Sequence, residues 1–286
     1  MKPSGVITIT TDFGHKGPFA GVMKGVILSR FPDARVVDLA HDIPAQWPPE
    51  AGFWVSRSYA WFPAGTVHMA IVDPGVGTER DILIVEADGH VFIAPDNGLL
   101  GQLLDSVESP RVFKLLASKI KPLQLQTPSA TFHGRDIFAP VAAEIAAGRV
   151  SIDDVGEQIS NWTPGWLDEP ETAAGKINGV IVTIDAFGNL ISNIDESLLD
   201  GFREPVANIG GHQIAMMQTY GRARPGDLLA LVNSFGVVEV AKAEGSAAEG
   251  LALIEVPRSS SRMAIAPSVM SRRFVLFQRD LLTLKS

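Results

Sequence analysis

The stretch Val6-Ile7-Thr8-Ile9-Thr10-Thr11-Asp12-Phe13-Gly14 decides how the first half of the chain folds. β-Branched residues at 6–10 predict a strand, and apolar residues at 19–31 recur at helical spacing until Pro32 ends the helix. A strand followed by a returning helix is the unit of an α/β domain. Because ligands of such sheets gather at the carboxyl ends of the strands, Asp12 stands where a ligand is expected.

The segments that follow repeat this pattern. Strands are predicted at 36–39 and 67–72, a helix at 49–59, and a hairpin of strands 82–87 and 90–94 around Asp88-Gly89. An alanine-rich helix at 137–147 is expected near the end of the domain. The sequence therefore predicts an α/β domain with a Rossmann-like sheet over residues 1–165.

The second half of the chain has a different pattern. Prolines and acids without apolar periodicity predict a linker at 166–176. Beyond it, short apolar runs separated by Gly and Asn turns predict a small all-β, barrel-like domain over residues 177–286. Its strands are expected at 179–185, 190–194, 206–209, 228–233 and 237–241.

Composition excludes several classes of function. The 286 residues carry 24 basic and 32 acidic side chains, a net charge of −8, and this acidic balance disfavours a nucleic-acid partner. There is no cysteine, which removes disulfides, thiolate nucleophiles and zinc sites built on sulfur and favours a cytoplasmic location. No stretch approaches the ~18 apolar residues of a membrane span, so no membrane association is expected.

Polar residues at predicted strand ends are the candidates for chemistry. The carboxylate of Asp12 could accept both hydroxyls of a ribose, or it could cap the following helix. Asp73 and Arg80 frame a glycine turn that lacks the lysine and third glycine of a phosphate loop. The Arg80 guanidinium could hold an anion or hydroxide with Asp73 fixing it, or the pair could be a structural salt bridge.

Two further segments are polar beyond what their local structure requires. His133, ahead of the alanine-rich helix, could accept a proton or orient a water molecule, or it could be a surface histidine. Its neighbours Arg135 and Asp136 are expected to pair or to cap the helix. The turn Asp185-Ala186-Phe187-Gly188-Asn189 could hold an amino group beside a stacked ring, although turn formation alone favours Asp, Gly and Asn.

A metal hydrolase is the competing interpretation. An N/O ligand set could come from His15, His41, His68, His90, His133, Asp12, Asp42 and Asp73. These residues show no metal-ligand spacing on a single element, so no metal site is expected.

Taken in order, the motifs resemble the S-adenosylmethionine hydroxide adenosyltransferase family, which is related to fluorinating and chlorinating enzymes. The matching motifs are Thr-Thr-Asp-Phe-Gly at 10–14, Val-Asp-Pro-Gly-Val-Gly-x-x-Arg at 72–80, Ala-Pro-Asp-Asn-Gly at 94–98, Phe-His-Gly-Arg-Asp-Ile-Phe-Ala-Pro at 132–140, Asp-x-Phe-Gly-Asn at 185–189 and Asn-Ser-Phe-Gly at 233–236. The resemblance spans residues 6–248.

The resemblance implies hydrolysis of S-adenosylmethionine to adenosine and L-methionine, without a cofactor. It implies a catalytic trio of Asp73, Arg80 and His133, and a ribose-binding role for Asp12. The implied methionine and adenine contacts are Asp185, Phe187, Asn189, Phe235, Ser246 and Ala247. It also implies a homotrimer whose active sites lie between the first domain of one subunit and the second domain of the next.

Two departures from the family pattern affect what it implies. Many relatives carry an aspartate where this chain has Gly17, which leaves Asp185 as the implied partner of the methionine amino group. The tail after Ala248 does not align with the family pattern and is not assigned to any element.

Two alternatives remain beside hydrolysis. A halide-dependent adenosyltransferase is disfavoured because such enzymes have small polar or aromatic groups where this chain has Arg80 and His133. A non-catalytic binder of S-adenosylmethionine or adenosine would need Asp12 and Phe187 but not the trio, and this chain has all three trio residues.

Overall fold

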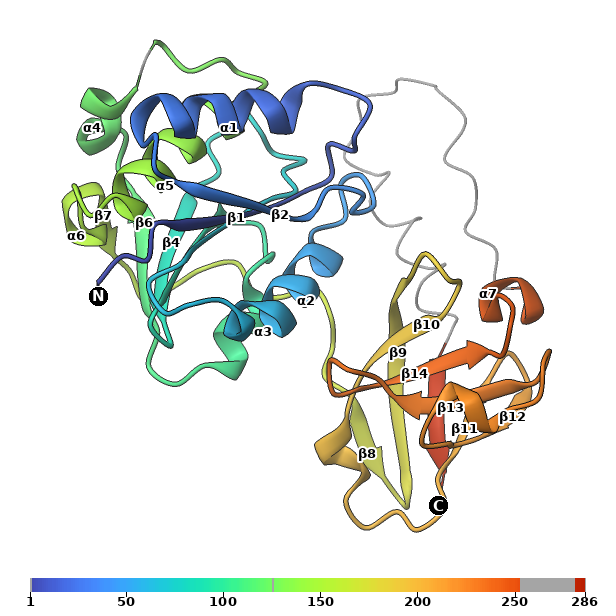
Figure 1. The fold of residues 1–286 in the computed structure, drawn as a ribbon. Coiled ribbons are helices and arrows are strands. Elements are labelled where there is room, and N and C mark those ends of the chain that lie inside the picture. The colour runs from blue at the N-terminus through green and yellow to red at the C-terminus, as the bar shows by residue number, and fades with distance from the viewer. Residues whose placement is uncertain (1, 125, 253–280, 286) are drawn as a thin grey trace. The chain divides into compact units, whose positions relative to one another are not determined.

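The computed structural model describes residues 2–124, 126–252 and 281–285. The chain forms two compact units, Met1–Leu167 (unit 1) and Asp168–Ser286 (unit 2). Figure 1 shows the course of the chain through each of them. Within the described ranges, no helix has the length and apolar character needed to cross a membrane.

Unit 1 is built on a seven-stranded sheet in the order β2-β1-β3-β5-β4-β6-β7. The strands are β1 (Val6–Thr11), β2 (Arg35–Ala40), β3 (Val67–Ile71), β4 (Ile82–Ala87), β5 (His90–Pro95), β6 (Arg111–Leu115) and β7 (Gly156–Gln158). The first four in sheet order run parallel, and β4, β6 and β7 pair antiparallel. The predicted α/β sheet is confirmed, and β6 and β7 are additions that the sequence patterns did not predict.

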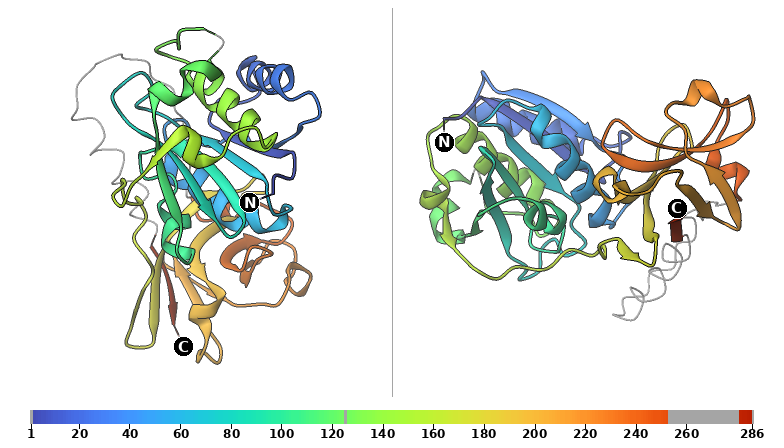
Figure 2. Two further views of the ribbon diagram at one scale, coloured as in Figure 1. Left: turned by 90° about the vertical axis from the view of Figure 1, so that its left-hand side faces the viewer. Right: turned by 90° about the horizontal axis from the view of Figure 1, so that it is seen from below.

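Helices cover both faces of this sheet because its strands alternate apolar side chains between two cores. The helices are α1 (Phe19–Arg30), α2 (Pro48–Ser58), α3 (Gly101–Ser106), α4 (Ala117–Ile120), α5 (Ala139–Ala146) and α6 (Ile152–Val155). Ile84 joins α1 and α5 in one core, and Val85 joins α2 and α3 in the other. Figure 2 shows α1, in blue, beside α5.

The hairpin predicted around Asp88-Gly89 is confirmed. β4 and β5 pair antiparallel in register from Ile82 opposite Pro95 to Ala87 opposite His90. Asp88 and Gly89 both have positive φ, 48° and 76°, as a two-residue turn between twisted strands requires.

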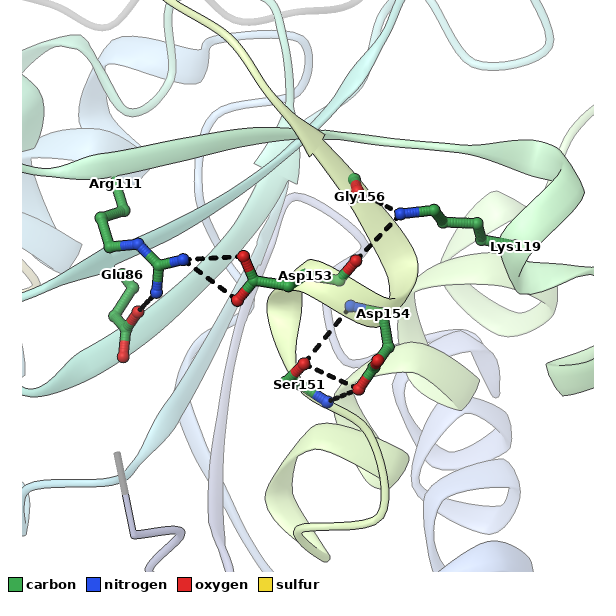
Figure 3. A network of polar contacts seen from close by, with 7 residues as sticks. All are labelled: Glu86, Arg111, Lys119, Ser151, Asp153, Asp154 and Gly156. Carbon is green, nitrogen blue, oxygen red and sulfur yellow. Dashed lines mark hydrogen bonds and ion pairs between the residues drawn. The ribbon is translucent and has the colours of Figure 1, made fainter.

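A polar network fastens the far edge of the sheet (Figure 3). Arg111 on β6 donates to Glu86 at 2.5 Å and to both carboxylate oxygens of Asp153 at 2.8 and 3.0 Å. Ser151 and Asp154 form a capping box at the start of α6, which fixes the short helix that leads into β7.

Unit 2 is an antiparallel sheet in the order β12-β11-β15-β9-β10-β14-β13, with β8 paired to β9. Its strands are β8 (Glu171–Ala173), β9 (Lys176–Ile184), β10 (Leu190–Asp195), β11 (Val206–Ile209), β12 (His212–Ala215), β13 (Leu228–Val232), β14 (Val237–Lys242) and β15 (Leu281–Lys285). A bridge between Met216 and Ala230 brings the two edges together, so the sheet nearly closes. The predicted barrel-like all-β fold is confirmed.

The second half of the chain differs from the sequence predictions in three segments, one of which is β12, a strand that was not predicted. The segment expected to be a linker, 166–176, contains β8, which pairs with the start of β9. The tail after Ala248 begins within the short helix α7 (Ala247–Gly250), and residues 281–285 form β15 between β9 and β11. Residues 253–280 of this tail lie outside the described residues.

Candidate active site

The loop that follows β3 carries Asp73 and Arg80 in a fixed conformation. Gly77 has a φ of +80°, and a Cβ there would lie 2.2 Å from the carbonyl oxygen of Ala130. Only glycine fits both the conformation and this close approach. The Thr78 hydroxyl closes the turn by donating to the carbonyl of Gly75 at 2.6 Å. The loop is therefore packed against the segment that leads to His133.

Arg80 and Asp73 form an oriented ion pair. Nε of Arg80 donates to the two carboxylate oxygens at 3.1 and 3.0 Å, and Nη2 also donates to Oδ2. The side chains are only 11% and 5% exposed. The ring of Phe138 lies 5.8 Å from Cζ of Arg80. Because a bidentate pair fixes both position and plane, Asp73 sets the direction in which the guanidinium points.

His133 is the third member of this group. Its Nδ1 atom lies 3.0 Å from Nη2 of Arg80. A guanidinium only donates, so Nδ1 accepts and the remaining ring proton is on Nε2. Burial and then the positive charge of Arg80 lower the pKa of His133 below its usual value of 6.5, although Asp73 and Asp136 act in the opposite direction. The structure thus brings Asp73, Arg80 and a neutral His133 together.

The pairing expected for Arg135 and Asp136 is confirmed. Arg135 donates to the two oxygens of Asp136 at 2.7 and 2.8 Å, and these hydrogen bonds lower the pKa of Asp136 despite its burial. The backbone N–H of Ser129 also donates to Asp136. The pair lies in a π-helical turn, Gly134–Phe138, ahead of α5, so α5 begins later than the predicted 137. Asp136 therefore holds the segment around His133.

Asp12 leaves the same edge of the sheet as Asp73, because Thr11 on β1 is paired with Ile71 on β3. The helix-capping interpretation is wrong: α1 has Pro18 at its N-cap position, without a side-chain cap. The Oδ2 atom of Asp12 instead accepts the backbone N–H of Gln46 at 2.8 Å.

Three phenylalanine rings pack together, two of them from the residues next to Asp12 and His133 in the sequence. The ring centroids of Phe13, Phe19 and Phe132 lie 5.4 to 6.0 Å apart. A Cβ added at Gly17 would lie 2.8 Å from the Phe19 ring. An acidic side chain at position 17 would therefore require this ring to move.

In unit 2, Asp185 organises the tight turn between β9 and β10. Its Oδ1 accepts the backbone N–H groups of Phe187 and Asn189, both at 2.9 Å, and its Oδ2 accepts Nδ2 of Asn189 at 3.0 Å. Phe187 is 77% exposed at the tip of this turn, a position in which its ring can stack on a ligand.

The same turn contacts the start of α7. Gly188 has a φ of +81°, and a Cβ there would lie 2.1 Å from Oγ of Ser246. Ser246 caps α7 by accepting the N–H of Glu249 at 3.1 Å. Ala247 is fully buried in the barrel core. The structure thus brings Ser246 and Ala247 to the Asp185 turn.

Phe235 lies on the turn between β13 and β14, where its backbone N–H donates to Oδ1 of Asn233 at 2.9 Å. Nδ2 of Asn233 donates to Glu239 at 3.2 Å, and the Tyr220 hydroxyl donates to the same carboxylate at 2.6 Å. Burial and the Glu239 hydrogen bond raise the pKa of Tyr220 above its usual value. Sequence reasoning missed Tyr220 and Glu239. The position of Glu239 within the apolar run Val237–Ala241 was the sequence feature that could have indicated these contacts.

The histidines do not gather into a metal site. In the part of the chain that the structure describes, no three His, Asp or Glu side chains are grouped so as to hold a metal ion. His68 and His90 instead bond to each other at 3.1 Å. Burial lowers the pKa of His68 to about 3, which leaves it neutral.

Comparisons with known proteins identify the family to which this chain belongs. The model of the SAM hydroxide adenosyltransferase N-terminal domain matches residues 7–156, and that of the C-terminal domain matches residues 179–256. The chain is 37% identical over 262 residues to the (R)-S-adenosyl-L-methionine hydrolase of Thermus thermophilus, covering 89% of this chain and 97% of that one. It is 34% identical to the enzyme of that name from Salinispora tropica, covering 87% and 94% of the two chains.

Other similarities are more distant. A fluorinase of Actinoplanes sp. is 26% identical, covering 68% of this chain and 73% of that one. The crystal structure of an uncharacterized conserved protein from Thermotoga maritima superimposes with a TM-score of 0.82 at 27% identity, covering 98% of this chain and all of that one.

Proposed function

The chain belongs to the SAM hydroxide adenosyltransferase family, and on that premise we propose that it hydrolyses S-adenosyl-L-methionine to adenosine and L-methionine. The main observation in support of the proposal is the hydrogen-bonded arrangement of Asp73, Arg80 and His133. Relatives named as hydrolases are 33–37% identical to this chain, whereas the fluorinases are 23–26% identical, which favours water over halide as the nucleophile.

The reaction requires activation of water rather than of the leaving group. Attack on the ribose C5′ forms a C–O bond while the C–S bond breaks, and sulfur keeps the electron pair as a neutral thioether. The attacking oxygen loses one proton to solvent and the other remains on the product hydroxyl. The protein therefore has to orient water and favour hydroxide character.

Arg80 and His133 each have a donor left for that task. Among the contacts of the described residues, none uses Nη1 of Arg80 or Nε2 of His133. Both atoms carry N–H groups, so together they suit an oxygen with developing negative charge. Asp73 positions the guanidinium, and burial of the ion pair reduces screening by solvent.

The substrate contacts follow the family pattern. Asp12 binds the ribose diol from the end of β1. Asp185, Phe187, Asn189, Phe235, Ser246 and Ala247 bind the methionine and adenine groups. We also propose a cytoplasmic enzyme that uses no cofactor, assembled as a homotrimer in which each site combines unit 1 of one subunit with unit 2 of the next.

One experiment tests the reaction. The purified protein is incubated with S-adenosylmethionine in ¹⁸O-labelled water, with and without chloride or fluoride, and the nucleoside product is identified by mass spectrometry. We expect adenosine carrying ¹⁸O at the 5′ position under all conditions. A halogenated nucleoside would support the halide-dependent alternative, and binding without any product would support the non-catalytic one.

A further inference from the structure

A series of hydrogen bonds, buried at one end and exposed at the other, starts at Thr11, the residue before Asp12. The Thr11 hydroxyl lies 2.8 Å from Nδ1 of His41, and Nε2 of the same ring lies 2.8 Å from Oδ1 of Asp38. Lys24 donates to the other oxygen of Asp38 at 2.5 Å. Thr11 is fully buried and His41 is 3% exposed, so the Thr11–His41 bond links the ends of β1 and β2 inside the protein, whereas Asp38 and Lys24 lie at the surface.

In this series of hydrogen bonds, the donor and the acceptor of each bond can be assigned. Burial acts to raise the pKa of Asp38, but the hydrogen bonds from Lys24 and His41 outweigh it and lower that pKa. An ionised Asp38 only accepts, so Nε2 of His41 is the donor. In the neutral ring, Nδ1 then accepts a hydrogen bond from the Thr11 hydroxyl. The Thr11 oxygen in turn accepts the backbone N–H of Phe13 at 3.2 Å.

The turn that contains Asp12 is tied to the His41 segment in two further ways. The N–H of Gly14, where φ is +64°, donates to the carbonyl of His41 at 2.8 Å. The N–H of Gln46 donates to the Asp12 carboxylate. Residues before and after Asp12 are therefore both fastened to His41, one through its ring and the other through its main chain.

We propose that His41 is a positioning residue that, through Thr11, aims the Asp12 carboxylate at the vicinal hydroxyls of the substrate ribose. The inference rests on the proposed function, which gives Asp12 its ligand. A bidentate contact to two neighbouring hydroxyls requires a fixed carboxylate plane, and the Thr11–His41 bond fixes the strand end from which that carboxylate projects. Loss of the bond affects affinity for the diol in particular, since the rest of the nucleoside is held elsewhere.

The chain offers a matched pair of variants. Thr11→Val removes the hydroxyl but keeps the shape of the side chain, and Thr11→Ser restores the hydroxyl. Thr8→Val is the control, because Thr8 lies on the same strand, is equally buried, and makes the same type of bond, 2.9 Å, to Nδ1 of His68. His41→Gln tests the ring itself, and thermal unfolding checks that each variant is folded.

Calorimetry with adenosine and 2′,3′-dideoxyadenosine gives the readout. We expect Thr11→Val and His41→Gln to weaken adenosine binding by about 10-fold, the effect of one lost hydrogen bond, with little change for the dideoxy compound. Thr11→Ser and Thr8→Val should keep the preference for adenosine. Equal weakening of both ligands, or no weakening in Thr11→Val, would overturn the inference. If the unaltered protein bound neither nucleoside, the proposed function would fail and the inference with it.

Discussion

Nη2 of Arg80 lies 3.0 Å from Nδ1 of His133, so the imidazole accepts a hydrogen bond from a cation that is itself held by Asp73. This contact joins two loops that are 53 residues apart in the chain. Its direction determines what each side chain can do. His133 is left with an N–H at Nε2, which suits it to hold the oxygen of a water molecule.

Substituting Arg80 with lysine tests whether the geometry of the cation matters. Arg80→Lys keeps the positive charge but loses the planar fork. We expect kcat to fall by ~10²-fold or more with little change in KM, as for a group that acts mainly in the transition state. The control is Arg111→Lys, which disturbs a comparable bidentate pair with Asp153 at the far edge of the sheet (Figure 3) and should leave kcat unchanged. An unaltered kcat in Arg80→Lys would remove this residue from the mechanism.

The lowered pKa of His133 predicts an acid limit to activity. Protonated His133 cannot accept the bond from Arg80, so kcat should fall as the pH drops through the pKa of His133, which lies below the ordinary histidine value of 6.5. The unfolded chain binds this proton more readily than the folded one, so His133 also lowers stability as the pH falls from 6.5 toward the lowered pKa of the folded state. NMR titration of the His133 ring should give a midpoint below 6.5, and Arg80→Met should raise it. A midpoint above 6.5 in the unaltered protein would contradict this electrostatic account.

Gly77 provides a test of the loop that carries Asp73 and Arg80. Gly77→Ala combines a positive φ with a Cβ only 2.2 Å from a backbone oxygen. We expect a loss of roughly 1–3 kcal/mol in stability and a reduced kcat, because the loop must move away from Ala130. Gly21→Ala in α1 is the control, since a Cβ there meets nothing within 4 Å and alanine favours helix by up to about 1 kcal/mol. Gly77→Ala should lower both the thermal unfolding temperature and kcat. Gly21→Ala should raise the unfolding temperature or leave it unchanged, and should leave kcat unchanged.

The proposed trimer predicts complementation between inactive subunits. His133→Ala damages unit 1 and Asp185→Ala damages unit 2. When the two proteins are denatured and refolded together, sites built from two different subunits should include some that are intact at both positions. Activity should therefore reappear on mixing. If subunits are shown to exchange and activity stays absent, each site is built within one chain, while the hydrolase assignment still stands.

The parallel core of unit 1 was predictable because β1, β3 and β5 are buried throughout and rich in β-branched or apolar residues. The strands that were missed are short and depend on their partners. β8 has three residues, all exposed, and only its pairing with β9 makes it a strand. β15 pairs with strands far away in the sequence, which no local pattern indicates.

In the candidate site, too, the sequence indicated which residues take part but not how they are arranged in space. Residue types and motif order singled out Asp73, Arg80 and His133. The bond between Arg80 and His133, and hence the tautomer of His133, depends on two loops meeting in space. For Asp12, a capping carboxylate and a ligand-binding one look alike in sequence. The absence of a side-chain cap on α1 excludes the first, and the ligand-binding role stays a prediction.

The placement of β15 affects the order in which the protein folds during its synthesis. Strand β14 ends at Lys242, but β15, which fills the gap between β9 and β11, begins only at Leu281. A ribosome therefore has to translate the intervening 38 residues before the barrel can be completed, whereas every strand of unit 1 has been made well before. Unit 1 can fold first on the nascent chain, while the edges of β9 and β11 remain unpaired and open to chaperones or to aggregation until the final strand arrives.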